Sequence, residues 1–201
     1  INTPQSGKVA VVIGGGAGHE PAFWGYVGAG LADAAVVGNT FASPPPDPII
    51  AATRAVQGAA GVLYIYGNFS GDVMNFDMAA EIMEAEGVRV RSVITTDDIA
   101  SSPRETRSAR RGVAGTTGAA ADLMLPLNEV ERMARHANAR TYTMGLALEP
   151  CSLPETRQPS FELGPDDMEI GVGVHGEPGV ERRNMETADT CADLLLDRIL
   201  E

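Results

Sequence analysis

Residues 8–13, KVAVVI, run directly into residues 14–21, GGGAGHEP. A short continuous apolar run of this kind is typical of a strand that is buried in a parallel sheet. We expect the glycines to end the strand abruptly and to open into a ligand loop, because glycine lets other groups approach the backbone closely. Residues 62–66 repeat this pattern and end at Gly67.

Strand and helix patterns alternate beyond this point. Residues 74–86 are rich in helix formers and stop at Gly87, and residues 88–94 are the next apolar run. Residues 51–57 and 127–137 are expected to be surface helices. The sequence therefore predicts an α/β fold with a mixed or mostly parallel sheet flanked by helices, in which ligands bind at the carboxyl ends of the strands.

The composition of the chain changes near residue 141, where a short apolar piece is followed by a loop rich in proline and acidic residues. We assign residues 1–140 to the main α/β region and residues 141–201 to the start of a second, smaller α/β unit that carries His175. The polar, arginine-rich residues 101–111 are expected to form a mobile loop. The last helix, residues 189–200, has an apolar side with little chain left to cover it, which indicates either a dimer or further sequence.

Composition excludes several classes of function. The 201 residues are 44% hydrophobic and 21% charged, which suits a globular protein. A net charge of −12 and a pI near 4.6 argue against a nucleic-acid partner. Cys151 and Cys191 have no metal-ligand spacing, so no metal site is expected. No run is long and apolar enough for a membrane partner, and we expect the protein in the cytoplasm.

The glycine run does not have the spacing of a dinucleotide-binding loop. The last position of the Gly-x-Gly-x-x-Gly pattern falls on His19 when it starts at Gly14 and on Pro21 when it starts at Gly16. A Walker sequence is also absent. We therefore expect the loop to turn its amides toward the hydroxyls or carbonyl of a small ligand rather than toward a nucleotide.

Two of the three histidines have nearly the same local setting. His19 and His175 each adjoin glycine and are followed by a Glu-Pro pair, whereas His136 is at the polar end of a helix. A neutral imidazole can act as nucleophile, base or hydrogen-bond donor near pH 7. The alternative is a buried histidine tied to backbone carbonyls, but the repeated glycine setting favours a site.

Asp72 follows another apolar run and is expected to stand just before a helix. Its carboxylate could accept a hydrogen bond from a substrate hydroxyl and take its proton. It could equally be the N-cap of the helix, holding the first amides. Together with the two histidines it would complete a small polar pocket.

Five ordered motifs over most of the chain resemble the substrate-binding K subunit or domain of dihydroxyacetone kinases. They are residues 14–21 (GGGAGHEP), 38–44 (GNTFASP), 68–76 (NFSGDVMNF), 110–115 (RRGVAG) and 174–179 (VHGEPG). The resemblance implies that the chain holds a short ketose for phosphorylation of a terminal hydroxyl. It implies a covalent hemiaminal on His175, with His19 and Asp72 hydrogen-bonding the substrate hydroxyls and assisting proton removal. The implied substrate-binding residues are Gly16, Ala17, Gly18, His19, Gly67, Asp72 and His175.

The resemblance also implies half of a kinase. The phosphoryl donor would lie on a separate L-type subunit, either as ATP with Mg²⁺ or as tightly bound ADP served by a phosphoprotein of the phosphotransferase system. This chain itself would bind no cofactor and would form a homodimer. Some similar proteins keep the ketose site as co-regulators of a transcription factor, so a ketose sensor is the alternative function.

Departures from the family pattern bear on the substrate. Polar residues common in the family are replaced here by Ala17, Phe23, Gly67 and Phe69. The family lysine at position 67 usually reaches the substrate, so we expect its loss to leave space or water beside the ketose. A four-carbon ketose such as erythrulose would suit a pocket made larger and less charged, so the expected substrate is dihydroxyacetone or such a tetrulose. The chain is short for the family, and we expect it to be truncated or to have gaps around Thr116 and Thr117.

Overall fold

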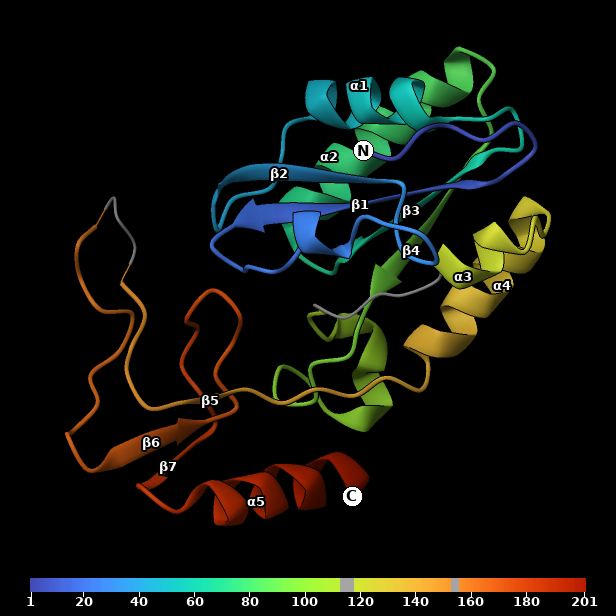
Figure 1. Ribbon diagram of the computed structural model, residues 1–201. Coiled ribbons are helices and arrows are strands. Elements are labelled where there is room, and N and C mark those ends of the chain that lie inside the picture. Colours follow the sequence, from blue (N-terminus) through green and yellow to red (C-terminus); the bar gives the residue numbers. More distant parts are fainter. Residues whose placement is uncertain (113–117, 153–155) are drawn as a thin grey trace. The chain divides into compact units, whose positions relative to one another are not determined.

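The computed structural model describes residues 1–112, 118–152 and 156–201 (Figure 1). The chain forms two compact units, each built from two stretches of sequence. Unit 1 comprises residues 1–96 and 112–141, and unit 2 comprises residues 97–111 and 142–201. The division into residues 1–140 and 141–201 did not anticipate that residues 97–111 join the second unit.

A four-stranded parallel sheet lies at the centre of unit 1. Its strands are β1 (Ala10–Ala17), β2 (Ala34–Thr40), β3 (Val62–Gly67) and β4 (Val90–Thr95), in the order β2-β1-β3-β4. β3 is buried along its whole length, which explains why its sequence is continuously apolar rather than alternating. Because all four strands are parallel, the loops that follow them meet at one edge of the sheet.

Helices cover both faces of this sheet (Figure 1). On one face, α1 (Pro46–Val56) and α2 (Ser70–Ala85) pack through Ile49 and Phe76. On the other face, α3 (Gly118–Asp122) and α4 (Leu127–Asn138) pack through Ala121 and Val130. The predicted α/β class, with a largely parallel sheet flanked by helices, is confirmed.

Two helices begin earlier than predicted. α1 begins at Pro46 rather than at residue 51, because proline is compatible with the first helical turn, where its missing N–H is no loss. α2 begins at Ser70 rather than at residue 74, and its N-cap position is Phe69. Asp72 therefore lies inside the first turn, and its interpretation as an N-cap just before the helix is wrong.

The glycines do not end β1. The strand continues to Ala17, with Gly14 and Gly15 paired to β2. A Cβ on Gly14 would lie 2.5 Å from the carbonyl oxygen of Val36, so a side chain there would collide with the neighbouring strand. The expectation of an abrupt strand end was wrong because these glycines allow close packing within the sheet.

The single lysine of the chain anchors the start of unit 1. Lys8 is 5% exposed, and its Nζ lies 2.7 Å from Oδ1 of Asp33 and 2.5 Å from Oδ1 of Asp122. Asp33 also accepts a hydrogen bond of 2.9 Å from the backbone N–H of Val11. Burial disfavours the charged ammonium, but the hydrogen bonds and charges of the two carboxylates outweigh it and raise the pKa of Lys8.

Unit 2 is built around a small antiparallel sheet. Its strands are β5 (Leu146–Ala147), β6 (Asp167–Ile170) and β7 (Glu181–Asn184), in the order β5-β6-β7. The stretch that was expected to be a mobile loop contains the 3-10 helix η2 (Arg104–Ala109). Nε of Arg110 donates a 2.7 Å hydrogen bond to the carbonyl of Ser102, which ties the two ends of this stretch together.

The last helix, α5 (Ala188–Leu200), begins at its cap Thr187, whose hydroxyl accepts a 3.2 Å hydrogen bond from the N–H of Thr190. None of its residues is buried, and Leu196 on its apolar side is 54% exposed.

Across the described part of the chain, no helix is both long enough and apolar enough to cross a membrane.

Candidate functional site

The loop after β1 holds His19 between two aromatic rings. Its imidazole stacks on Phe41, with ring centroids 4.8 Å apart and planes 17° apart, and meets Phe23 edge-on at 6.2 Å. Gly18 has a φ of +95°, a conformation that favours glycine, and its N–H donates to the Glu20 carboxylate at 3.3 Å. The aromatic neighbours fix the plane of the half-buried imidazole.

The space that a Cβ would occupy at the glycines beside His19 is already filled by residues 41 and 42. A Cβ on Gly16 would lie 2.6 Å from the backbone nitrogen of Ala42, and one on Gly18 would lie 2.6 Å from the ring of Phe41. The expected openness of this backbone is therefore absent on that side. Ala17 is the last residue of β1 and pairs with Thr40.

Asp72 lies at the same edge of the sheet as the His19 loop. It is 7% exposed in the first turn of α2, where the positive end of the helix dipole favours a carboxylate. The loop after β2 joins the two regions, because Phe41 stacks on His19 while the hydroxyl of Ser43 accepts a 3.1 Å hydrogen bond from Asn75 of α2. Unit 1 therefore brings His19 and Asp72 to one edge, as the sequence analysis expected of ligand loops.

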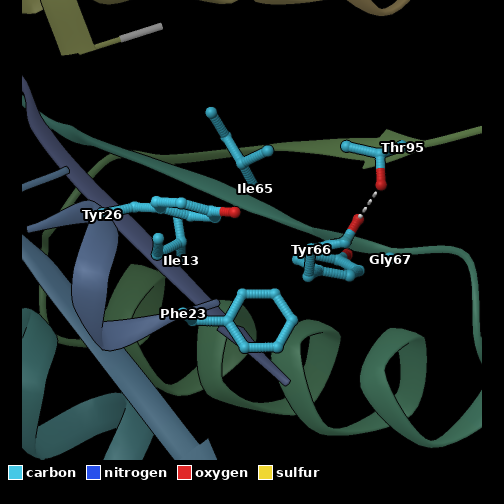
Figure 2. A pocket seen from close by; sticks show the side chains of 7 residues that line it. All are labelled: Ile13, Phe23, Tyr26, Ile65, Tyr66, Gly67 and Thr95. Atoms are coloured by element: carbon cyan, nitrogen blue, oxygen red, sulfur yellow. Dashed lines mark hydrogen bonds between the residues drawn. The ribbon is translucent and has the colours of Figure 1, made fainter. Parts of the chain in front are cut away.

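A small hollow of about 20 Å³, room for little more than one water molecule, lies at this end of the sheet and is partly open to solvent (Figure 2). It is lined by Ile13, Phe23, Tyr26, Ile65, Tyr66, Gly67 and Thr95. The ring of Phe23 and the side chains of the two isoleucines make its walls mainly apolar. Of the site residues proposed from the sequence, Gly67 is the one that lines it.

Gly67 has less space beside it than the sequence suggested. A Cβ at this position would lie 2.4 Å from the carbonyl oxygen of Gly112 and 3.0 Å from the ring of Phe69. Backbone of the chain thus occupies the direction that a side chain at residue 67 would take. The rest of the arginine-glycine motif, residues 113–115, falls within residues 113–117, which lie outside the described part of the chain, together with Thr116 and Thr117.

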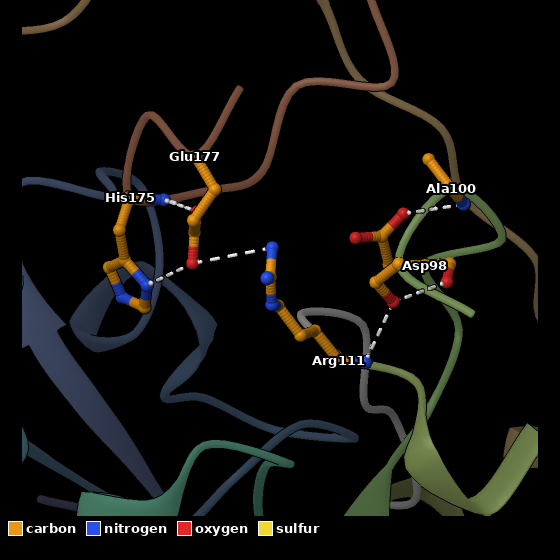
Figure 3. Close-up of polar contacts among 6 residues, drawn as sticks. Asp98, Ala100, Arg111, His175 and Glu177 are labelled. Carbon is orange, nitrogen blue, oxygen red and sulfur yellow. Dashed lines mark hydrogen bonds and ion pairs between the residues drawn. The ribbon is translucent and has the colours of Figure 1, made fainter. Parts of the chain in front are cut away.

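His175 belongs to unit 2 and lies in a tight turn (Figure 3). The turn is closed by hydrogen bonds from the N–H of Gly176 to the carbonyl of Gly173, at 2.9 Å, and from the N–H of Gly173 to the carbonyl of Glu177, at 3.0 Å. Gly176 has a φ of +77°, which favours glycine at this point. The His175 side chain is 24% exposed, so its ring can be reached from solvent.

Glu177, which contacts both His175 and Arg111, is a residue of this turn that the sequence analysis did not single out. One carboxylate oxygen accepts a 2.9 Å hydrogen bond from the N–H of His175, and the other lies 3.4 Å from Nδ1 of the His175 ring. The same oxygen is 3.5 Å from Nη1 of Arg111. Arg111 and Glu177 lie in two of the motifs that resemble the family, residues 110–115 and 174–179. A carboxylate two residues after a histidine was the sequence signal that could have indicated their contact.

The described residues contain no group of three or more histidine, cysteine or acidic side chains placed to hold a metal ion. Unit 1 carries an imidazole and a carboxylate at one sheet edge, and unit 2 separately carries an imidazole next to a carboxylate. Groups of these types can bind hydroxyls and move protons, and a neutral imidazole can add to a carbonyl.

The fold is that of an α/β protein with a parallel sheet flanked by helices, and comparison with known families makes the assignment specific. The Dak1 domain matches residues 1–201, and the chain belongs to this family. It is 47% identical over 200 residues to the PTS-dependent dihydroxyacetone kinase 2, dihydroxyacetone-binding subunit DhaK, of Listeria innocua, a match that covers 96% of this chain and 60% of the relative. It is 46% identical over 204 residues to the D-erythrulose kinase of Mycolicibacterium smegmatis, covering 98% of this chain and 35% of the relative.

Solved structures agree with this family assignment. The dihydroxyacetone kinase of C. freundii in complex with AMP-PNP and Mg²⁺ matches with a TM-score of 0.88 and 37% identity, covering 98% of this chain and 37% of that one. The dihydroxyacetone kinase operon co-activator DhaQ matches with a TM-score of 0.85 and 36% identity, covering 95% of this chain and 60% of that one. The chain thus spans about three fifths or less of each of these proteins.

Proposed function

We propose that this chain is the ketose-binding part of a dihydroxyacetone-type kinase. The observation that carries the proposal is the 47% identity to a dihydroxyacetone-binding subunit, and His19, Asp72 and His175 lie in the motifs by which the sequence resembles this family. His175 binds the ketone carbon as a hemiaminal, and His19 and Asp72 bind the hydroxyls and assist removal of the proton from the attacking one. The stacked imidazole of His19 and the buried carboxylate of Asp72 support these roles, because both groups are held by their surroundings.

A covalent bond to the carbonyl explains how such a site selects its substrate. Polyols such as glycerol have no carbonyl and cannot form the bond, so a short ketose is retained in preference to them. Tethering also fixes the terminal hydroxyl, and positioning is most of what phosphoryl transfer requires of a protein. Gly16, Ala17, Gly18 and Gly67 complete the proposed binding surface.

The phosphoryl donor in this proposal lies on a separate L-type subunit, as ATP with Mg²⁺ or as ADP recharged by a phosphoprotein. The glycine run of this chain has neither the dinucleotide nor the Walker spacing, which supports a donor site elsewhere. The similarity to PTS-dependent subunits favours the phosphoprotein route. We further propose that the protein acts in the cytoplasm as a homodimer.

The substrate is dihydroxyacetone or a tetrulose such as erythrulose. The similarity to a D-erythrulose kinase supports the longer ketose. Turnover of dihydroxyacetone and of both erythrulose enantiomers, measured with a donor subunit present, decides between them. A clear preference for the triose would exclude the tetrulose assignment.

A ketose sensor that regulates transcription is the second candidate, supported by the similarity to the DhaQ co-activator. The two functions differ in their product. When the protein is mixed with ketose, ATP, Mg²⁺ and an L-type subunit, the kinase component yields sugar phosphate and the sensor does not.

The hemiaminal is tested directly with a ketose labelled with ¹³C at its carbonyl carbon. Binding as proposed converts this carbon from trigonal to tetrahedral, and its NMR signal leaves the ketone region. His175→Ala should abolish the bound signal, whereas His136→Ala, which changes an exposed histidine on α4, should leave it unchanged. An unchanged signal in His175→Ala would disprove the assignment of the covalent residue.

A further inference from the structure

The turn that carries His175 is organised around one carboxylate. Glu177 receives the backbone N–H of His175 on Oε2, at 2.9 Å, and places Oε1 3.4 Å from ring atom Nδ1 (Figure 3). The backbone N–H and the ring of His175 thus face the same carboxylate group. This arrangement restricts both the position and the rotation of the imidazole.

The carboxylate of Glu177 is itself held from the other side by Arg111. The guanidinium lies 3.5 Å from Oε1, and a Cβ on Gly173 would lie 2.1 Å from Oε2, so only glycine leaves room for the carboxylate there. The backbone of Arg111 is anchored at both of its polar groups. Its N–H donates to the hydroxyl of Ser101 at 2.9 Å, and its carbonyl accepts from the N–H of Asp98 at 3.0 Å.

Glu177 is ionised at neutral pH in this setting. Its partial burial disfavours the charged form, but the hydrogen bonds from its own N–H and from that of His175, together with the charge of Arg111, outweigh the burial and lower the pKa of Glu177. An ionised carboxylate has only acceptor oxygens. The ring nitrogen that faces it is therefore the one that carries a proton.

We propose that Glu177 is a positioning residue for His175, which holds the imidazole with its proton on Nδ1 and its lone pair on Nε2, and that Arg111 keeps the carboxylate in place for this role. The inference rests on the proposed function of His175 as the residue that binds the ketose. It names two further residues, Glu177 and Arg111, on which the bond depends.

The chemistry of the adduct follows from this arrangement. The lone pair of Nε2 forms a bond to the carbonyl carbon, the electron pair of the C=O π bond moves to the oxygen, and the oxygen takes a proton from solvent. The imidazole keeps its Nδ1 proton and becomes cationic. Glu177 accepts a hydrogen bond from this proton throughout, and its negative charge stabilises the cationic ring.

The test uses the full chain with ¹⁵N-labelled histidine, and it begins without ketose. Long-range ¹⁵N–¹H correlation spectra report which ring nitrogen of His175 is protonated. We expect Nδ1–H in the natural protein and a population shifted toward Nε2–H in Glu177→Gln. Glu181→Gln is the matched control, because this glutamate pairs with Arg183 and Arg198 and has no contact with His175 among those described.

The second measurement titrates the ¹³C-labelled ketose. Replacement of the charged acceptor by a neutral amide at this partly exposed position removes the charge that stabilises the cationic adduct, and should raise the ketose concentration for half-formation of the adduct about tenfold in Glu177→Gln. Arg111→Gln leaves the carboxylate present and should give a smaller increase. Should either variant fail to fold by circular dichroism, the other still tests the proposal.

The outcomes separate this inference from the proposed function. An unshifted tautomer in Glu177→Gln, or equal changes in Glu177→Gln and Glu181→Gln, would overturn the positioning role of Glu177 even if the natural protein forms the adduct. Absence of an adduct in the natural protein, with the tautomer set as expected, would instead overturn the proposed function of His175.

Discussion

Replacement of Lys8 by methionine should destabilise the protein strongly. Methionine has a similar length, so the change removes the charge while largely keeping the volume. It leaves the carboxylate of Asp33, whose side chain is 8% exposed, without its cation. The carboxylate of Asp122 also loses its partner, but its side chain is 33% exposed and can be hydrated.

The magnitude follows from this difference in exposure. Breaking a buried ion pair by removing one partner costs about 3–5 kcal/mol, because an uncompensated buried charge remains. Only Asp33 meets that description fully, so we expect the free energy of unfolding to fall by about 3 kcal/mol, at the low end of the range. Adding Asp33→Asn to Lys8→Met should restore part of the loss, since the amide oxygen can still accept from Val11.

Urea denaturation followed by far-UV circular dichroism measures this change. Arg54→Met is the matched control, because the ion pair of Arg54 with Glu86 is exposed and such pairs contribute little to stability. A loss for Lys8→Met that is no larger than that of the control would refute the reasoning. So would a double variant that is less stable than Lys8→Met alone.

Three further predictions concern the core, the hollow and the pH dependence. Thr53→Val removes the 2.8 Å hydrogen bond to the buried hydroxyl of Tyr64 and should cost about 1–3 kcal/mol in urea denaturation, and less than that in a Tyr64→Phe background. Gly67→Ala forces a Cβ against the carbonyl of Gly112 and should cost about 1–3 kcal/mol, whereas Gly28→Ala, whose nearest contact would be 3.8 Å away, should cost less; equal melting temperatures for the two variants would contradict the packing argument. Glu177 has a pKa below its ordinary value of 4.5, so its ionised form contributes stability above pH 4.5 that is lost as the pH falls through the lowered value. Melting temperatures of Glu177→Gln should therefore fall less steeply with acid than those of the natural protein, and parallel curves would exclude this contribution.

The elements that the sequence predicted well are those with a strong hydrophobic pattern of their own. β3, β4, α4 and α5 were expected within a few residues of their observed bounds. The two strands are short apolar runs, and the two helices have apolar residues at helical spacing, so each pattern can be recognised within a single stretch of sequence. β7 had no such signal, since its residues Glu181–Asn184 are all polar and become a strand only by pairing with β6. β2 was missed as well, and its partners along β1 include the glycines that were interpreted as a loop.

The candidate site shows the same division. His19, Asp72 and His175 were found because each lies in a distinctive local motif. The ring contacts of His19 with Phe23 and Phe41 were not found, because the packing of one loop on another depends on the fold. The contact between Arg111 and Glu177 was not found for the same reason, since it joins residues far apart in the sequence.

The discontinuity of unit 2 has a practical consequence for dissecting the protein into fragments. Expression of residues 142–201 alone would supply His175 and Glu177 but would omit residues 97–111, and with them Arg111. The polypeptide between the two segments of this unit belongs to unit 1, so no single cut isolates it. A fragment of residues 142–201 would therefore contain Glu177 without Arg111, the positively charged side chain that pairs with it.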